Sequence, residues 1–134
     1  MPGFSFGPRS EANLQGVHPD LVRVVRRALE ISPVDFGVAE GVRDYARQKV
    51  LFEAGKSRTM NSRHLRGRDG HGHAVDLYPS VKAGPEFVRA DFEPVVAAIK
   101  QAATELGLPI ECGHDWKSFP DSPHIQLPAL AYQS

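Results

Sequence analysis

An aspartate inside a short apolar segment is the feature that most constrains the fold. Residues 73–78 read His-Ala-Val-Asp-Leu-Tyr, which predicts a strand that ends before Pro79. Side chains alternate between the two faces of a strand, so Asp76 lies opposite Val75 and Leu77. Because a buried carboxylate needs a partner, this strand predicts either a salt bridge from Asp76 to an arginine or a metal site.

A second strand is expected at residues 124–127, and its alternation matches that of the first. His124 lies on one face of this segment, and Ile125 and Leu127 lie on the other. If the two strands are neighbours, Asp76 and His124 point to one site. The aliphatic side chains of both strands then fill a core on the opposite face.

The rest of the chain mixes helical and extended patterns. Apolar residues recur at helical spacing in the segments 19–31, 43–54 and 91–106, and further strands are expected at 34–39 and 108–112. For the second helix, the expected apolar face is Ala46, Val50, Leu51 and Ala54. This order predicts an α+β fold, with a small, mostly antiparallel sheet flanked by about three helices.

The segments outside these elements are read as irregular. Residues 1–17 are polar and rich in glycine and serine, and predict an irregular lead-in. Residues 56–72 predict a long loop, and long loops in compact domains are often functional. With 134 residues in total, the chain is expected to form one domain, residues 1–134.

Charge and cysteine content exclude several classes of protein. Lys and Arg number 16 and Asp and Glu number 16, so the net charge is zero and nucleic acid is not an expected partner. A single cysteine, Cys112, excludes an internal disulfide framework and an all-cysteine metal site. Apolar runs are too short to predict membrane insertion, and the first residues lack the pattern of a secretory signal, so synthesis as a cytoplasmic chain is expected.

Histidines gather late in the chain and lie close to acids. Five of the six histidines follow position 63. Zinc takes imidazole nitrogens with a carboxylate as a third ligand, and a catalytic site keeps a fourth position open for water. Two histidines and Asp76 would meet that need. Asp121, on the loop that enters the strand of His124, would be within reach of the water as a general base.

Each candidate also has an ordinary structural interpretation. Asp121 could be a turn residue, Arg43 the solvated start of a helix, and Trp116 a core residue. His18 and His114 are expected to be surface or core residues without a chemical role.

Several short motifs in one order carry a family resemblance. The chain resembles the zinc peptidases of the D-alanyl-D-alanine carboxypeptidase and dipeptidase family, and most closely their phage endolysin branch, the L-alanyl-D-glutamate peptidases. The resemblance covers residues 10–130. The motifs are Glu40-Gly41-Val42-Arg43, Arg47-Gln48, Ser62-Arg63-His64, Gly72-His73-Ala74-Val75-Asp76-Leu77, Gly113-His114-Asp115-Trp116 and Asp121-Ser122-Pro123-His124-Ile125-Gln126-Leu127.

The resemblance implies one Zn²⁺ per chain and a role for eight residues. These are the zinc ligands His64, Asp76 and His124, the catalytic acid/base Asp121, the oxyanion-stabilising Arg43, and the substrate contacts Ser62, Trp116 and Gln48. It further implies a monomer that cuts the peptidoglycan stem peptide, made in the host cytoplasm and reaching the wall after the membrane is permeabilised. No separate wall-binding domain is expected.

The chain departs from the family pattern at two places. Twelve positions separate His64 from Asp76, as if residues 68–72 were inserted, and His71 in that segment is a rival ligand. We expect His64 to be the ligand and His71 to lie on a flap near the mouth of the site. His73 should face away from Asp76. The second departure, at residues 111–115, affects the expected substrate contacts.

Other functions remain open from the sequence. A D,D-carboxypeptidase acting on terminal D-Ala-D-Ala would use the same metal set. A catalytically inactive zinc-binding domain would not need both Asp121 and Arg43. A cysteine peptidase based on Cys112 is disfavoured, because the nearest histidine, His114, is too close in sequence to pair easily.

Overall fold

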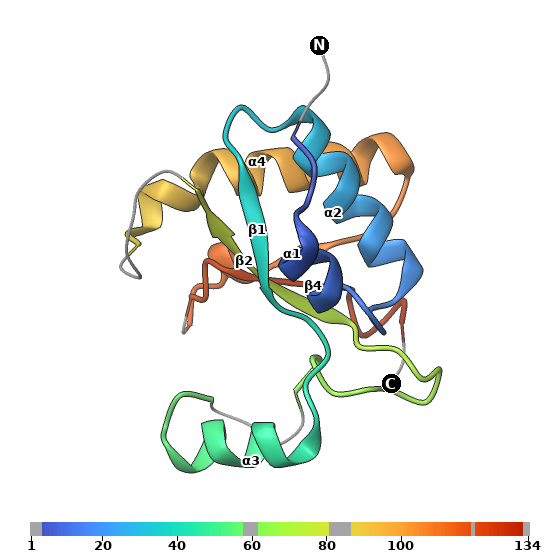
Figure 1. The fold of residues 1–134 in the computed structure, drawn as a ribbon, viewed down its shortest axis with the longest axis vertical. Coiled ribbons are helices and arrows are strands. Elements are labelled where there is room, and N and C mark those ends of the chain that lie inside the picture. Colours follow the sequence, from blue (N-terminus) through green and yellow to red (C-terminus); the bar gives the residue numbers. More distant parts are fainter. Residues whose placement is uncertain (1–3, 58–61, 81–86, 119, 133–134) are drawn as a thin grey trace.

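The computed structural model describes residues 4–57, 62–80, 87–118 and 120–132, and shows an antiparallel sheet with helices packed against it (Figure 1). The sheet has four strands in the order β1-β2-β4-β3. The strands are β1 (Phe36–Glu40), β2 (Ala74–Pro79), β3 (Glu111–Cys112) and β4 (His124–Gln126). The helices are α1 (Pro8–Asn13), α2 (Pro19–Ile31), α3 (Tyr45–Glu53) and α4 (Arg89–Leu106), with a 3-10 turn, η1, at Gly113–Asp115. The predicted α+β class is confirmed.

Helices α2 and α4 form the layer that covers the apolar face of the sheet. The predicted face of α2 is fully buried, namely Leu21, Val24, Val25, Ala28 and Leu29. Pro19 occupies the first turn of α2, and the His18 ring accepts a hydrogen bond from the Asp20 amide at 3.0 Å, which caps the helix. Helix α4 begins at Arg89, two residues before the predicted start, because the Asp91 carboxylate caps the Val88 amide at 2.9 Å.

The two strands expected to be neighbours are paired, and their predicted faces coincide. Strands β2 and β4 are antiparallel, and Asp76 lies directly opposite His124 while Val75 lies opposite Ile125. Val75, Leu77, Ile125 and Leu127 are all buried in the core. The sheet therefore separates an apolar face, which is covered by α2 and α4, from a face that carries the polar candidates.

Two expectations about helices are wrong. Residues 1–17 are not irregular throughout, because α1 lies within them. Helix α1 packs on β1 through polar contacts: the Val38 amide donates to Ser10 Oγ at 3.0 Å, and Asn13 Nδ2 donates to the Val38 carbonyl at 2.8 Å. A helix of six residues without an apolar stripe leaves no periodic signal in the sequence.

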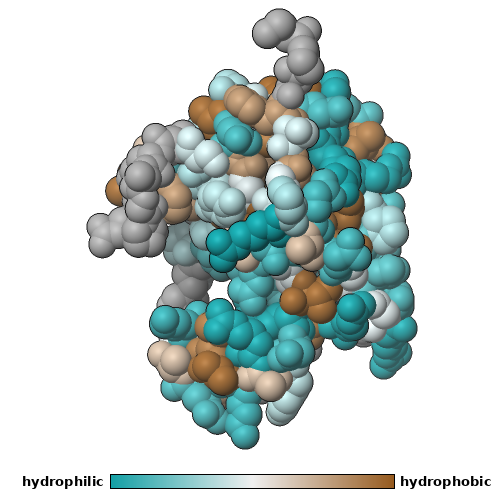
Figure 2. Space-filling view, viewed as in Figure 1, coloured by the Kyte–Doolittle hydropathy of each residue, from teal (hydrophilic) through white to brown (hydrophobic). Residues whose placement is uncertain are grey.

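The predicted apolar face of α3 is also wrong. This helix lies apart from the sheet and from the other helices (Figure 1). Figure 2 shows apolar patches on the surface that the helix forms. Val50 is 58% exposed, whereas Gln48 is buried completely. The helix is therefore attached through a polar side chain.

The remaining differences concern the ends of elements. Strand β1 begins at Phe36 and ends at Glu40, and β3 is only two residues long instead of covering 108–112. Within the described part of the chain, none of the helices has the length and apolar character required to cross a membrane.

Candidate metal centre

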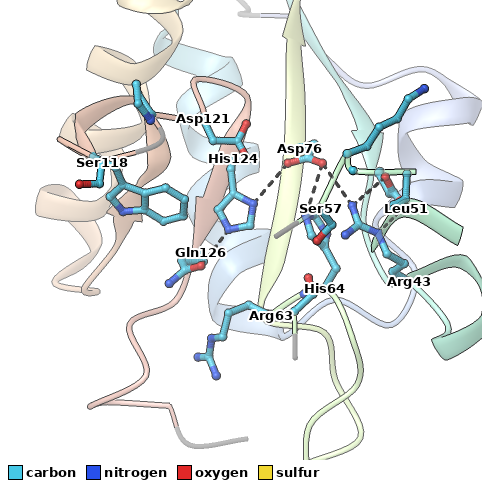
Figure 3. Close-up of a pocket in the computed structure, with 16 residues that line it drawn as sticks. Arg43, Leu51, Ser57, Arg63, His64, Asp76, Ser118, Asp121, His124 and Gln126 are labelled. Atoms are coloured by element: carbon cyan, nitrogen blue, oxygen red, sulfur yellow. Dashed lines mark hydrogen bonds and ion pairs between the residues drawn. The ribbon is translucent and has the colours of Figure 1, made fainter. Parts of the chain in front are cut away.

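Two histidines and one aspartate meet on the polar face of the sheet (Figure 3). Ligand atoms of His64, Asp76 and His124 all lie within 4.8 Å of one another. Asp76 contributes both oxygens: Oδ2 lies 3.4 Å from His64 Nε2, and Oδ1 lies 3.4 Å from His124 Nδ1. Asp76 and His124 come from paired strands, whereas His64 comes from the loop that precedes β2.

Hydrogen bonds on the far side of each ring assign the protons of the two histidines. His64 Nδ1 lies 2.8 Å from the Gly41 carbonyl, which can only accept, so this nitrogen carries the proton and Nε2 keeps its lone pair. His124 Nε2 lies 2.8 Å from Gln126 Oε1, which also only accepts, so Nε2 carries a proton and Nδ1 of the neutral ring keeps its lone pair. In the neutral rings, both lone pairs face Asp76.

The donor set fits a zinc ion. His64 Nε2 and Asp76 Oδ1 are buried, and neither has a hydrogen-bond partner among the described residues. Buried polar atoms are normally satisfied, so this pair of orphaned atoms indicates a missing partner. Zinc–nitrogen and zinc–oxygen bonds of about 2.1 Å in tetrahedral geometry place two ligand atoms roughly 3.4 Å apart. Each histidine nitrogen lies 3.4 Å from an oxygen of Asp76, a different oxygen in each case, and one ligand atom from each of the three residues lies within 4.8 Å of the others. The three side chains are therefore close enough to share one ion.

The charges of the site support one another. Burial opposes ionisation of Asp76, but its contacts with His124 and His64 outweigh that cost and hold the pKa of the carboxyl well below its usual range. Burial would lower the pKa of His124, but the contact with Asp76 prevails and raises it. The ionised carboxylate of Asp76 therefore supplies negative charge for a cation held between these side chains.

Arg43 lies beside the cluster and is held from two sides. Its guanidinium donates to both carboxylate oxygens of Glu40, at 2.8 and 3.0 Å, and to Gln48 Oε1 at 2.7 Å. Nη2 lies 3.6 Å from Asp76 Oδ2. The charge of Arg43 holds the pKa of Glu40 below its ordinary value. A register shift between Val38 and Glu40 in β1 brings Glu40 opposite Asp76 and so positions this pair.

Gln48 does not occupy the position that the sequence predicts. Instead of lining the pocket as a substrate contact, it is buried behind Arg43 and donates from Nε2 to Ser57 Oγ at 2.7 Å. Its side chain connects α3 to the guanidinium and to the segment after the helix. The polar anchor of α3 and the neighbour of Arg43 are thus the same residue.

Asp121 lies on the wall of the pocket, on the loop that enters β4, and its carboxylate is directed toward the space beside Asp76 and His124 (Figure 3). Its amide donates to the Gly113 carbonyl at 2.9 Å. A Cβ at Gly113 would collide with the Asp121 carbonyl, so glycine is needed for this close approach. Partial burial, and then the charge of Asp76, raises the pKa of Asp121 above its ordinary value.

The cluster opens into a pocket of about 820 Å³. Ser62 and Trp116 both line it, as the sequence predicts. Ser62 Oγ also accepts from the His64 amide at 3.1 Å, and the Trp116 ring lies 5.3 Å from the His124 ring between centroids. Polar side chains line the pocket around His64, Asp76 and His124.

His71 is not at the mouth of this pocket, contrary to expectation. It belongs to a second histidine cluster, which consists of His18, His71 and His73. The His71 ring lies 5.5 Å from the His18 ring between centroids. His73 faces away from Asp76, as predicted, and its Nε2 lies 2.7 Å from Asp69 Oδ2. Asp69 thus holds residues 69–73 together, because it also accepts from the His71 amide at 2.9 Å.

Two residues of the site were not identified from the sequence. Glu111 Oε2 accepts from Gln126 Nε2 and from Trp116 Nε1. The alternation of the 124–127 strand places Gln126 on the face of His124, and that was the available signal. Glu111 required the pairing of β3 with β4, which sequence periodicity does not give.

Comparisons with known proteins find relatives that share one named activity. The family model of the phage L-alanyl-D-glutamate peptidases matches residues 2–128. The chain is 34% identical over 122 residues to the L-alanyl-D-glutamate peptidase of Escherichia phage T5, which covers 88% of this chain and 85% of that protein. The crystal structure of the Serratia marcescens L-Ala D-Glu endopeptidase ChiX is similar with a TM-score of 0.85 and 42% identity, over 97% of this chain and 95% of that one.

Proposed function

Because this chain belongs to the phage L-alanyl-D-glutamate peptidase family, we propose that it hydrolyses the L-Ala–D-Glu bond of the peptidoglycan stem peptide with one bound zinc ion. The names of both relatives support this bond. The arrangement of His64, Asp76 and His124 supports the metal.

One observation carries the metal-dependent part of the proposal. His64 Nε2 and His124 Nδ1 each present a lone pair to Asp76 from 3.4 Å, and hydrogen bonds on their opposite sides hold both rings. Ligating histidines are characteristically oriented in this way by a second hydrogen bond. Three protein ligands also leave the open position that a catalytic zinc requires.

A zinc ion bound there would polarise the scissile carbonyl and lower the pKa of a water toward about 7. Asp121 acts as the general base that removes a proton from the attacking water and then delivers it to the leaving amine. Its raised pKa suits this exchange, because a carboxyl that ionises closer to neutral pH both takes up and releases a proton more readily.

Arg43 stabilises the negative charge that develops on the carbonyl oxygen. Arginine offers five N–H donors in a rigid plane, more than the contacts with Glu40 and Gln48 use. Those contacts hold the guanidinium before substrate arrives, so little reorganisation is needed during the reaction. Ser62 and Trp116 contact the bound peptide on the pocket wall.

The proposed biological role is lysis of a bacterial host. The similarity to a phage peptidase that is named for this bond supports a role as an endolysin. In this role the protein acts as a monomer, accumulates in the host cytoplasm and reaches peptidoglycan once the membrane has been permeabilised.

Metal removal and reconstitution test the proposal. The purified protein should contain about one zinc per chain by elemental analysis. Chelation should abolish hydrolysis of purified cell walls, and added zinc should restore it. Undiminished hydrolysis by metal-free protein would show that the zinc assignment is wrong.

A further inference from the structure

Glu111 lies at one end of a hydrogen-bonded chain that reaches the metal cluster. In the antiparallel pair of β3 and β4, Glu111 is directly opposite Gln126. Its Oε2 accepts from Gln126 Nε2 at 3.2 Å, and Gln126 Oε1 lies 2.8 Å from His124 Nε2. The hydrogen-bonded chain of side chains thus runs from Glu111 through Gln126 and His124 to Asp76. Figure 3 shows the last three of these residues in line.

Glu111 determines which groups donate and which accept along these hydrogen bonds. An ionised carboxylate only accepts hydrogen bonds, whereas a glutamine amide has one accepting end and one donating end. Glu111 therefore turns the NH₂ end of Gln126 toward itself and leaves the carbonyl end facing His124. An accepting oxygen at His124 Nε2 holds the proton on that nitrogen and leaves Nδ1 with a lone pair.

The opposite orientation of Gln126 would disable the histidine as a ligand. With its NH₂ end toward His124, the amide would need an accepting Nε2, and the neutral ring would then carry its proton on Nδ1. That is the atom that lies 3.4 Å from Asp76 Oδ1, where the metal would bind. The terminal torsion of glutamine permits both orientations, so a neighbour must select one.

We infer that Glu111 is a positioning residue that selects, through Gln126, the form of His124 able to bind zinc at Nδ1. The inference rests on the proposed metal centre and extends it to a residue outside the ligand set.

Glu111 has a second contact that the test must separate from the first. The same oxygen, Oε2, accepts from Trp116 Nε1 at 3.0 Å, and the indole lies against the His124 ring. Both donors converge on one oxygen, so a neutral amide at position 111 could satisfy them with its carbonyl end. A cation at that position could satisfy neither.

The experiment measures the zinc affinity of the full-length protein by competition with a chelator. Glu111→Gln should keep the zinc Kd within about 3-fold of wild type. Glu111→Lys should attract the carbonyl end of Gln126, turn the amide and weaken zinc binding by roughly 10- to 100-fold, the usual effect of losing a partner that orients a ligand. Unfolding midpoints establish that each variant is folded, and Glu111→Met replaces Glu111→Lys if the lysine prevents folding.

A rescue variant distinguishes loss of the Gln126 orientation from general damage to the folded structure. In Glu111→Lys/Gln126→Glu, the residue at 126 can only accept, whichever way it turns, so the proton returns to His124 Nε2. Zinc affinity should recover to within a few-fold of wild type. Trp116→Phe, which removes only the second donor to Glu111, should leave the zinc Kd within about 3-fold.

Long-range ¹H–¹⁵N spectra of the zinc-loaded wild type should show His124 coordinated at Nδ1 and protonated at Nε2. Wild-type affinity in Glu111→Lys, or a double variant as weak as Glu111→Lys, would overturn the inference while leaving the metal centre standing. A wild-type protein that fails to bind zinc would overturn both.

Discussion

Asp121 and the three metal-cluster residues have different tasks in this mechanism, and single substitutions separate them. Asp121→Asn removes the general base but leaves His64, Asp76 and His124 in place. The variant should keep one zinc per chain and lose roughly 10²- to 10⁴-fold in hydrolysis rate. Elemental analysis and the rate of cell-wall hydrolysis measure the two effects.

Asp115→Asn is the matched control, because Asp115 pairs with Lys100 at 2.7 Å, outside the pocket. It should retain nearly full activity. An Asp121→Asn enzyme within a few-fold of wild type would show that another group is the base.

Cys112 should be chemically inert in the folded protein. It is buried, and desolvation raises the pKa of its thiol to about 11. At pH 8 only about one thiol in a thousand is then ionised, and the thiolate is the reactive form. Aromatic disulfide reagents should react with Cys112 only after denaturation, and Cys112→Ala should keep its hydrolysis rate. Rapid labelling of native protein with loss of activity would instead favour a cysteine peptidase.

Residues predicted from strand alternation lie where the sequence places them, whereas Gln48, whose place depends on tertiary contacts, does not. Asp76 and His124 face one site because a period of two is a local property of a strand. Gln48 was expected to contact substrate, yet it is buried behind Arg43. A motif identifies such a residue but does not say which of its neighbours it contacts.

The loop between α3 and β2 contacts the rest of the protein at two separate places. Its first part carries His64 to the metal cluster, where the His64 carbonyl also accepts from the Arg43 amide at 2.9 Å. Its second part carries His71 and Asp69 to the second histidine cluster. Residues 68–72, read from the sequence as an insertion, are therefore held apart from His64.

This division predicts opposite effects for the two histidines of the loop. His71→Ala should keep stoichiometric zinc and most activity, because His71 packs against His18 instead of the metal cluster. His64→Ala should lose zinc after dialysis. Metal analysis of the two variants decides the matter: zinc retained in His64→Ala and lost in His71→Ala would mean that the inserted histidine is the ligand.

Among the elements, those with an apolar periodicity could be predicted and those held by polar contacts could not. Helix α2 was predicted by its buried stripe, whereas α1 is attached through Ser10 and Asn13. Helix α3 is predicted by its sequence pattern, but its apolar residues are exposed apart from the half-buried Leu51, and its one fully buried side chain is Gln48. Polar anchoring leaves no periodic hydrophobic signal.

At the scale of the whole molecule, the two faces of the sheet have different roles. Its apolar face packs on α2 and α4, and its polar face holds the metal cluster, so substitutions in the site should leave the core intact. The C-terminal segment adds a contact across the fold: the Tyr132 hydroxyl donates to Asp20 Oδ2, in the first turn of α2, at 2.7 Å.

This contact predicts a loss of stability in alkali. Burial, and then the hydrogen bond to Asp20, raises the pKa of Tyr132 from 10.0 to about 12. A group whose pKa is raised by folding stabilises the protein below its unfolded pKa, and that contribution disappears as pH rises from about 10 to 12. Tyr132→Phe should weaken this part of the pH dependence in urea unfolding, whereas the exposed control Tyr45→Phe should not. Identical profiles for Tyr132→Phe and wild type would contradict the assignment.

The central claim is that the zinc-loaded protein cuts between L-Ala and D-Glu, and product analysis tests it most directly. Purified muropeptides are digested with the zinc-reconstituted protein, and the products are identified by mass spectrometry. The expected products are glycan fragments that end in L-Ala, together with released peptides that begin with D-Glu. Loss of a terminal D-Ala alone, with the L-Ala–D-Glu bond intact, would contradict the claim and identify a D,D-carboxypeptidase.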